Sequence, residues 1–426
     1  MGVILRGGRV LVPARAEPAP LDVAVQDGLI QAIGADLKAD DGDRVIDCSG
    51  LVVAPALVDL YTRVGEPGFE FREDLATLSA AAAAGGFVAV CSAPDSKPIN
   101  DTKAVTELIL SRAREVGGVE VWPLAALTEQ LGDDNLSELG ELAEAGAVAA
   151  STGRRWLAGG GIARRGFEYA RTFDLPVMVT PYDRSVAGNG VVHESALATR
   201  LGLRGVPVAA ESAALARDLE LAELTGARLI ATHLSSARAV GLIREAKARG
   251  VGVVGATTVH LLVLDESAVA GYDPVAKLWP PLRSGADRDA LVAAVADGTI
   301  DCVFAGHDPQ AVVDKDHEFD DAAPGASSIE LALAVLLDLV AAGKLTLDRA
   351  IDAASGAPRR ALARSQALEA GARADLCVFD PEREWTVEPA RMRSRSKSTP
   401  LAGRRLRGQV RWTVAAGEVI YEAKHD

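Results

Sequence analysis

Short apolar runs separated by turn residues mark both ends of the chain. They cover residues 3–5, 9–12, 21–25, 29–33 and 44–46 near the N-terminus, and residues 374–379, 411–414 and 418–421 near the C-terminus. This pattern predicts the short strands of a small antiparallel β unit. Because neither end holds enough strands for an independent sheet, we expect residues 1–53 and 371–426 to pack together as a composite β-sandwich domain.

Between these ends, in residues 54–370, β-branched runs alternate with alanine- and leucine-rich segments of helical period. The runs that predict strands are residues 57–60, 87–90, 119–122, 147–150, 177–179, 229–232, 251–254 and 302–305. Alternation of this kind is typical of a parallel α/β domain. Eight such units over about 300 residues predict a TIM (β/α)8 barrel, in which an active site lies at the C-terminal ends of the strands.

The composition adds limits on partners and compartment. The chain has 426 residues, 49% of them hydrophobic, and a formal net charge of -14. Negative charge of this size repels the phosphates of nucleic acids and of anionic membranes, so we expect neither as a partner. The four cysteines lie far apart in apolar runs, and no apolar run reaches the roughly 18 residues that span a bilayer. We therefore expect a cytoplasmic protein with reduced, buried thiols and no export signal or membrane anchor.

Several motifs carry a resemblance to a known family. They include Pro-Ala-Leu-Val-Asp-Leu at residues 55–60, Thr-His-Leu-Ser-Ser at 232–236, Pro-Pro-Leu-Arg at 280–283 and Ser-Lys-Ser-Thr-Pro at 396–400. In order and spacing these motifs resemble the dihydroorotase branch of the cyclic amidohydrolases. The match spans nearly the whole chain, which makes it far more specific than any one tetrapeptide.

The resemblance implies an enzyme that holds one or two zinc ions at the barrel mouth. There the metal lowers the pKa of a bound water and polarises the carbonyl of a cyclic amide. In the family, the first barrel strand ends in His-x-His, which places both imidazoles on the inward face. The matching positions here are Tyr61 and Arg63. The fixed positive charge of arginine repels a divalent cation, so this replacement argues strongly against a metal.

The other family positions are changed as well. A bridging aspartate, a histidine ligand and the aspartate that is both ligand and general base correspond here to Thr152, Thr180 and Gly306. Positions at which the family binds substrate through an arginine and two asparagines correspond to Gly65, Asp95 and Trp279. His233 is the one retained ligand, and a lone imidazole does not hold zinc. We therefore expect no catalytic residue, no cofactor and no metal, with zinc present only if the chain is still a hydrolase.

One further cluster has metal-like composition, and its members are His307, Asp308, Asp314, Asp316 and His317. They lie in an acidic stretch, residues 307–321, that resembles the loop after the last barrel strand. A solvated loop is the interpretation we favour.

Other reactive or charged residues have plainer explanations. Cys91 lies at the end of the second strand, where a nucleophile could act, but no base accompanies it. We expect structural roles for His193 and His260. The basic run between residues 391 and 407 predicts a salt-bridged surface or a subunit contact rather than a nucleic-acid site.

The sequence keeps the motifs that the resemblance associates with the fold but lacks most of the metal-binding and catalytic residues. This combination suggests a non-catalytic relative of dihydroorotase. Proteins that resemble this one accompany the catalytic subunit of aspartate carbamoyltransferase in several bacteria. The leading hypothesis is therefore an assembly subunit for that transferase in pyrimidine biosynthesis, within a homo- or hetero-oligomer. Two alternatives stay open: a hydrolase with a rebuilt site that uses His233, Asp183, His307 or Cys91, and a small-molecule sensor that kept the pocket.

Overall fold

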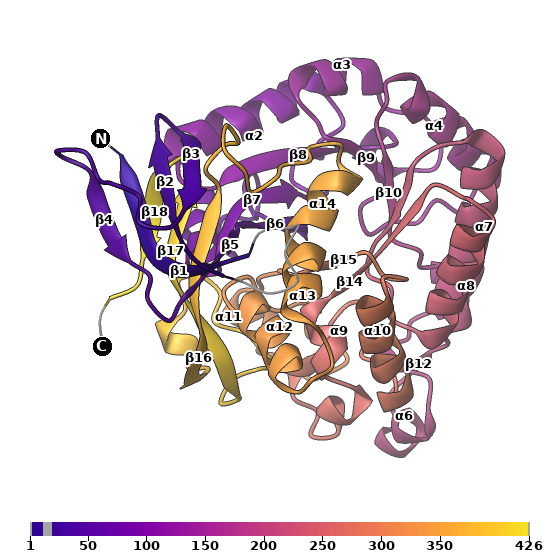
Figure 1. The fold of residues 1–426 in the computed structure, drawn as a ribbon. Helices are drawn as coiled ribbons and strands as arrows, with labels where there is room; N and C mark the ends of the chain where they lie inside the picture. The colour runs from indigo at the N-terminus through magenta and orange to yellow at the C-terminus, as the bar shows by residue number, and fades with distance from the viewer. Residues whose placement is uncertain (1, 12–18, 425–426) are drawn as a thin grey trace.

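Eight parallel strands form a barrel in the computed structural model, which describes residues 2–11 and 19–424 (Figure 1). In hydrogen-bonded order they are β6 (Leu57–Thr62), β7 (Phe87–Ser92), β8 (Glu120–Ala126), β9 (Ala149–Ser151), β10 (Val177–Val179), β13 (Leu229–Ala231), β14 (Val253–Thr258) and β15 (Cys302–Phe304). β15 contacts β6, and the buried Asp59 carboxylate accepts the backbone N–H of Ala305 at 2.6 Å across this seam. The predicted TIM barrel is confirmed, with each of the eight predicted strands overlapping an observed one.

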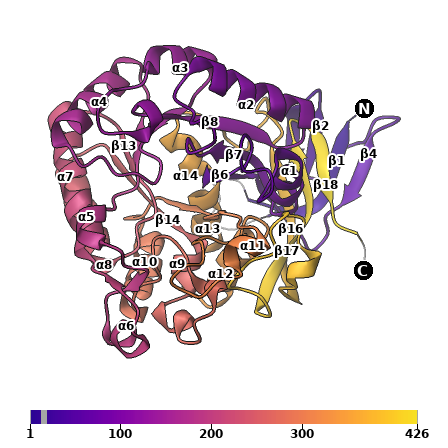
Figure 2. The same cartoon turned by 180° about the vertical axis from the view of Figure 1, so that it is seen from behind.

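Helices surround the barrel on the outside, as both views show (Figures 1 and 2). The longer ones are α1 (Leu75–Ala84), α2 (Lys103–Val116), α3 (Leu139–Ala145), α4 (Gly160–Thr172), α7 (Ala209–Thr225), α8 (Ala237–Ala248), α10 (Gly285–Asp297), α12 (Ala332–Ala341) and α13 (Leu347–Ala354). The shorter elements are α5 (Arg184–Ala187), α6 (Ala196–Leu201), α9 (Val259–Val263), α11 (Val312–Lys315), α14 (Gly356–Ala361), β11 (Val192–His193) and β12 (Gly205–Val206). Capping side chains such as Asp74, Ser236 and Ser284 accept the first free backbone N–H groups of α1, α8 and α10.

The barrel interior is filled with apolar side chains, so it is a core and not a pore. Alternate residues of each strand point inward, and they include Val58, Leu60, Ala89, Leu124, Met178 and Phe304. A second and larger core lies between the strands and the helices. Because the interior is apolar, a polar site has to lie at the ends of the strands. The family resemblance implies the C-terminal ends.

The two ends of the chain share a second sheet. Its strands are β1 (Val3–Val10), β2 (Ala19–Gln26), β3 (Leu29–Gly34), β4 (Arg44–Asp47), β5 (Val52–Pro55), β16 (Leu376–Thr386), β17 (Arg405–Ala415) and β18 (Glu418–Glu422). Antiparallel pairing of β5 with β16 joins the two ends, and the sheet encloses its own apolar core. The expectation that the ends pack together is confirmed. The division of the chain into domains at residues 53 and 371 stays a prediction.

The expected antiparallel pattern of the N-terminal strands is wrong in part. β1 pairs with β2 in antiparallel fashion, but with both β4 and β5 in parallel fashion. The chain returns to the other side of β1 after a long connection rather than through a hairpin, which permits parallel pairing. Residue 12, which the sequence pattern assigns to a strand, lies outside the described residues.

The segment that follows β16 reaches back to the top of the barrel. Ser394 donates its hydroxyl hydrogen to the Glu73 carboxylate, and the backbone N–H of Arg395 donates to Glu73 at 2.9 Å. Arg395 also forms an ion pair with Asp74, the capping residue of α1. These contacts fix the C-terminal segment against the loop that leads away from β6.

Two further expectations concern environment. All four cysteines are free and buried, as expected. Among the described helices, none has both the length and the apolar character that crossing a membrane requires.

Candidate functional site

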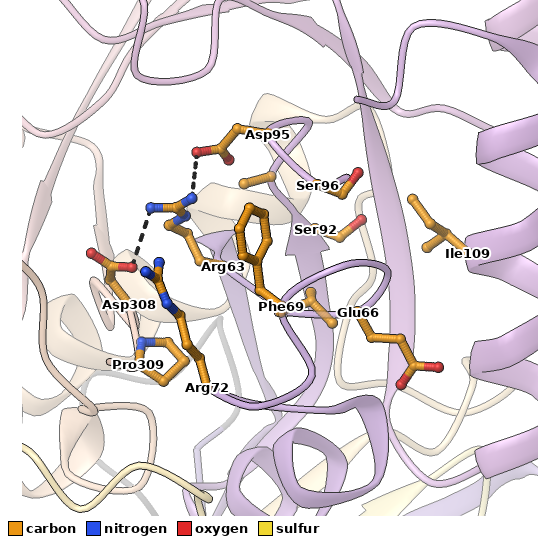
Figure 3. Close-up of a pocket in the computed structure, with 13 residues that line it drawn as sticks. Arg63, Glu66, Phe69, Arg72, Ser92, Asp95, Ser96, Ile109, Asp308 and Pro309 are labelled. Atoms are coloured by element: carbon orange, nitrogen blue, oxygen red, sulfur yellow. Dashed lines mark ion pairs between the residues drawn. The ribbon is translucent and has the colours of Figure 1, made fainter. Parts of the chain in front are cut away.

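The C-terminal end of β6 brings Arg63 to the centre of the barrel mouth. Its guanidinium lies 3.0 Å from the Asp95 carboxylate and 3.5 Å from that of Asp308, so it bridges two acidic side chains from different strand ends (Figure 3). Arg154, after β9, approaches Asp308 from the other side at 2.7 Å, and its guanidinium lies over the Trp279 ring at 4.8 Å. We call Arg63, Asp95, Asp308 and Arg154 the mouth network.

Ion pairs within the mouth network shift the pKa values of Arg63 and Asp308 toward the charged forms. Burial alone would lower the pKa of Arg63, but the facing carboxylates of Asp95 and Asp308 outweigh burial and raise that pKa. Burial alone would likewise raise the pKa of Asp308, whereas Arg154 and Arg63 hold it below the ordinary value. Arg63 and Asp308 are therefore both ionised at neutral pH, and each has an opposite charge beside it.

His233 lies beside the network in an aromatic cage. Its ring contacts those of Tyr61, Trp279 and Phe304, with centroids 5.0, 5.5 and 4.9 Å away. Its Nδ1 lies 3.0 Å from the Thr232 hydroxyl. Burial, reinforced by the positive charge of Arg154, lowers the pKa of His233 well below its usual value. A neutral, enclosed imidazole of this kind packs as part of the structure.

Tyr61 fills the remaining space next to His233. Its side chain is buried, and burial raises the pKa of the phenol further above its usual range. The phenol is therefore a neutral hydroxyl. It offers a metal no anionic oxygen at neutral pH.

The three other positions that the resemblance singles out carry no charge. The hydroxyls of Thr180 and Thr232 lie 3.0 Å apart, and the Thr152 backbone N–H donates to the Met178 carbonyl. Gly306 has a φ of +68°, and a Cβ there would lie 2.8 Å from the Cβ of Thr258. The backbone at Gly306 therefore disfavours the aspartate that the family carries, because both the left-handed conformation and the adjacent threonine oppose a side chain.

Space at the mouth is small. The pocket lined by Arg63, Asp95 and Asp308 has a volume of about 20 Å³, and the one lined by Arg154, His233 and Trp279 is equally small. A cavity of that size holds about one water molecule. Ligand sites for ring-shaped molecules are usually about 300 Å³ or more. The side chains that replace the family ligands therefore also fill the mouth.

The donor set does not fit zinc. Within residues 2–11 and 19–424, no group of three or more His, Cys, Asp or Glu side chains is arranged to hold a metal ion. The imidazole of His233 faces aromatic rings, and the Asp308 carboxylate is already neutralised by two guanidinium groups. The carboxylates of Asp95 and Asp308 are both engaged by these guanidinium groups, so neither is free to bind a divalent cation.

The predicted solvated loop at residues 307–321 is wrong for its first part. His307 and Asp308 are only 1% and 4% exposed, because the chain crosses the barrel mouth before it reaches the surface at α11. The Nδ1 of His307 accepts the backbone N–H of Ser328 at 3.1 Å, and its Nε2 lies 3.4 Å from a Glu73 carboxylate oxygen. From Asp316 onward most of the acidic side chains are exposed, as expected.

Cys91 and Asp183, considered for a rebuilt site, and His193, expected to be structural, all lie apart from the mouth network. Burial raises the pKa of the Cys91 thiol, which disfavours the reactive thiolate. Asp183 caps α5 by accepting the backbone N–H groups of Ser185 and Val186. His193 lies 3.3 Å from a guanidinium nitrogen of Arg283 through its Nδ1. The structure places none of these three in the mouth network.

The sequence pattern missed Arg154 and placed Asp308 in a solvated loop, although these two residues complete the mouth network. Both lie within four residues of the end of a barrel strand, which is the signal that could have identified them. Glu73 is a further residue that the sequence pattern did not single out, although it is fully buried and binds Ser394, Arg395 and Thr77.

Comparisons with known proteins agree with this architecture. Residues 50–239 match a family model described as dihydro-orotase-like. The dihydroorotase of Anaeromyxobacter dehalogenans strain 2CP-C is 43% identical over 99% of this chain and 98% of its own length, and that of Citrifermentans bemidjiense is 39% identical over 99% and 100%. Among solved structures, the L-hydantoinase (dihydropyrimidinase) of Arthrobacter aurescens superposes with a TM-score of 0.88 at 25% identity, over 99% of this chain and 96% of that one.

Proposed function

The chain belongs to the dihydroorotase-like family of cyclic amidohydrolases. We propose that this member does not catalyse metal-dependent hydrolysis and that it serves instead as an assembly subunit. The partner we propose is the catalytic subunit of aspartate carbamoyltransferase, which the resemblance implies. The free, buried cysteines suit the cytoplasm, where we place this complex.

The observation that carries the loss of hydrolysis is the mouth network. Arg63 stands at a position where the resemblance implies a metal ligand, and the two arginines and two aspartates of the mouth network balance one another in charge. Hydrolysis of a cyclic amide in this family needs an activated water and a general base. Gly306 stands at the position of that base, and its backbone conformation disfavours a carboxylate side chain.

Co-purification tests the assembly role. The chain and the aspartate carbamoyltransferase of the same organism are expressed together and apart, then compared by size-exclusion chromatography with light scattering. We expect one complex that contains both chains, and a higher melting temperature for the transferase within it. Separate elution, with transferase assembly and activity indifferent to this chain, contradicts the assembly role.

A second candidate function is hydrolysis of a cyclic amide through a rebuilt site. The specific observation in its favour is that relatives 39 to 43% identical over nearly their full length bear the name dihydroorotase. The names of the relatives favour this hydrolase. The side chains at the barrel mouth, which offer few metal ligands, favour the non-catalytic assembly subunit.

Turnover separates the two candidates. The chain is assayed with dihydroorotate, a hydantoin and allantoin, beside a His233→Ala variant. Turnover that disappears in the variant supports the second candidate. Equal and negligible rates for both proteins support the first.

A further inference from the structure

A groove with a volume of about 730 Å³ lies where the barrel meets the terminal sheet. It runs between the start of α12 and strands β16, β17 and β18, and both views show α12 beside β16 and β17 (Figures 1 and 2). The groove is far larger than the two pockets at the barrel mouth. Its volume falls within the range of about 300 to 1,000 Å³ that small-molecule sites occupy. We call it the basic groove, after four side chains in its lining: Arg383, Arg391, Arg393 and Lys424.

Positive charge exceeds negative charge in the basic groove. All four cationic side chains are exposed, and the two carboxylates in the lining belong to Glu330 and Glu388. Glu330 accepts the backbone N–H of Arg393 at 2.8 Å and that of Ser394 at 3.0 Å, so backbone donors already engage its charge. Glu388 lies 3.9 Å from Arg391, and both side chains are more than half exposed, so this pair is weak.

Two guanidinium groups of the groove have no carboxylate partner. Among the described residues, neither Arg383 nor Arg393 forms an ion pair. The Arg393 guanidinium lies instead over the Tyr421 ring, 5.0 Å from its centroid. Arginine binds phosphate through paired N–H donors, and these two side chains are available to do so.

The same groove has a fixed aromatic lining. Trp385 and Tyr421 contribute rings to it, and Leu333 and Val410 add apolar surface. The indole N–H of Trp385 donates to the Gly408 carbonyl at 2.8 Å, which holds that ring in place. A ring that is already fixed loses little freedom when a ligand packs against it. Aromatic side chains of this kind bind nucleobases by stacking, whichever base is present.

The charge of the whole chain limits the size of the anion. The net charge is -14, so a long polyanion such as a nucleic acid is repelled by the surface beyond the groove. A small molecule that carries its negative charge close to a flat ring meets only the groove. A fatty acid would use the cationic side chains but not the flat faces of the aromatic rings.

We propose that the basic groove binds a nucleoside polyphosphate, with the base against Trp385 and Tyr421 and the phosphates on Arg383 and Arg393. This site goes beyond the proposed function, because it requires neither the transferase nor any chemistry at the barrel mouth.

Isothermal titration calorimetry of the wild-type chain tests the site, with ATP and UTP as probes and a chelator present to keep the phosphates free of metal. Three partial ligands accompany them. Inorganic triphosphate has the charge without the ring, adenosine has the ring without the charge, and decanoate has one charge on a flexible chain. We expect both nucleotides to bind at one site per chain, about tenfold or more tightly than any partial ligand.

Two substitutions separate the contributions of charge and ring. Arg383→Glu should weaken ATP binding about tenfold or more, because a carboxylate replaces a guanidinium that binds phosphate. Tyr421→Leu keeps an apolar side chain but removes the ring, so it should weaken ATP much more than inorganic triphosphate.

The matched control is Arg200→Glu. It makes the same change of charge at an exposed arginine on α6, which both views place on the other side of the barrel from β16 (Figures 1 and 2). This variant should bind ATP like the wild-type chain. Circular dichroism confirms that each variant is folded.

The proposal is overturned if neither nucleotide binds, if inorganic triphosphate or decanoate binds as tightly as ATP, or if Arg383→Glu leaves ATP binding intact. A groove filled by another protein would also leave both nucleotides unbound, and that result counts against the proposal. Loss of ATP binding in Arg383→Glu, with full binding in Arg200→Glu, supports it. Neither result bears on the assembly role, which co-purification with the transferase tests separately.

Discussion

At the scale of single residues, the barrel mouth depends on one buried carboxylate. Asp308 is 4% exposed and lies between the guanidinium groups of Arg63 and Arg154, while Gln310 donates to it at 2.9 Å. A buried charge is tolerated only when opposite charges and hydrogen bonds replace the lost water. Each member of the mouth network therefore depends on the others.

Replacing Asp308 with asparagine should destabilise the fold. The change leaves Arg154 without its ion-pair partner and Arg63 with Asp95 alone, and we expect the free energy of unfolding to fall by about 2 to 3 kcal/mol. That figure is below the cost for a fully enclosed pair because the Arg63 and Arg154 side chains are 20% and 14% exposed. Chemical denaturation at neutral pH measures it.

Asp174→Asn is the matched control for this substitution. Asp174 pairs with Arg228 at 3.0 Å, but its side chain is 90% exposed. An exposed pair is screened by water, so the control should change stability by at most about 0.5 kcal/mol. Equal effects of the two substitutions contradict the structural role given to the mouth network.

His260 gives the mouth a pH dependence of known sign. Burial lowers its pKa to about 4, whereas a histidine in an unfolded chain titrates near ~6.5. Between about pH 6.5 and pH 4, His260 is protonated in the unfolded state but stays neutral in the folded state. The free energy of unfolding therefore falls as the pH is lowered through this range. Between pH 7 and pH 5 the wild-type chain should lose about 2 kcal/mol more than a His260→Gln variant.

Urea unfolding at the two pH values measures this difference. The buried neighbour Leu261 provides the control, since Leu261→Ala should lower stability by the same amount at both pH values. Parallel pH dependence of the wild-type chain and the His260→Gln variant contradicts the assignment.

Single residues also show how far the sequence could lead. The residue types at Tyr61, Arg63 and Gly306 were sufficient to argue against a metal, because charge and donor type follow from the side chain alone. The partners of Arg63 were not predictable in the same way. Asp308 belongs to an acidic stretch whose composition is that of a solvated loop, and only the fold brings its first two residues across the barrel mouth.

At the scale of elements, α12 and β17 join the barrel to the terminal sheet. Gly408 in β17 has a φ of +95°, and a Cβ there would clash with the Cδ1 atom of Leu337 on α12. Leu337 is buried. The close approach of the helix and the strand therefore requires glycine at this position.

Gly408→Ala should test that contact. We expect a loss of roughly 2 to 4 kcal/mol in the free energy of unfolding, from the left-handed backbone and from overpacking against Leu337 together. Gly403→Ala separates the two causes, because Gly403 also has a positive φ but nothing within 4 Å of a new Cβ. It should cost only about 1 kcal/mol. Equal losses for the two variants contradict close packing of α12 on β17.

The elements were largely predictable because their signals are local. Short apolar runs such as residues 57–60 and 87–90 lie within β6 and β7. The start of β14 at Val253 rather than at residue 251, and the parallel pairing of β1 with β4 and β5, were not predictable. Those features depend on which strand lies alongside, which is a tertiary property.

At the scale of the whole molecule, fold and chemistry have separate determinants. The TIM barrel depends on the apolar layers inside and outside the strands, and those layers are complete. The chemistry of the family depends on a few side chains at the strand ends, and here they form ion pairs and aromatic contacts instead. A chain can therefore keep 43% identity to a dihydroorotase while the residues at its barrel mouth make these other contacts.

The central claim is that this barrel mouth does not hold zinc and does not hydrolyse a cyclic amide. Elemental analysis of the chain purified after zinc-supplemented expression, together with a dihydroorotate assay in both directions, tests it most directly. We expect bound zinc far below one ion per chain, and no turnover above that of a His233→Ala variant. One tightly bound zinc per chain, with turnover that the variant abolishes, contradicts the claim.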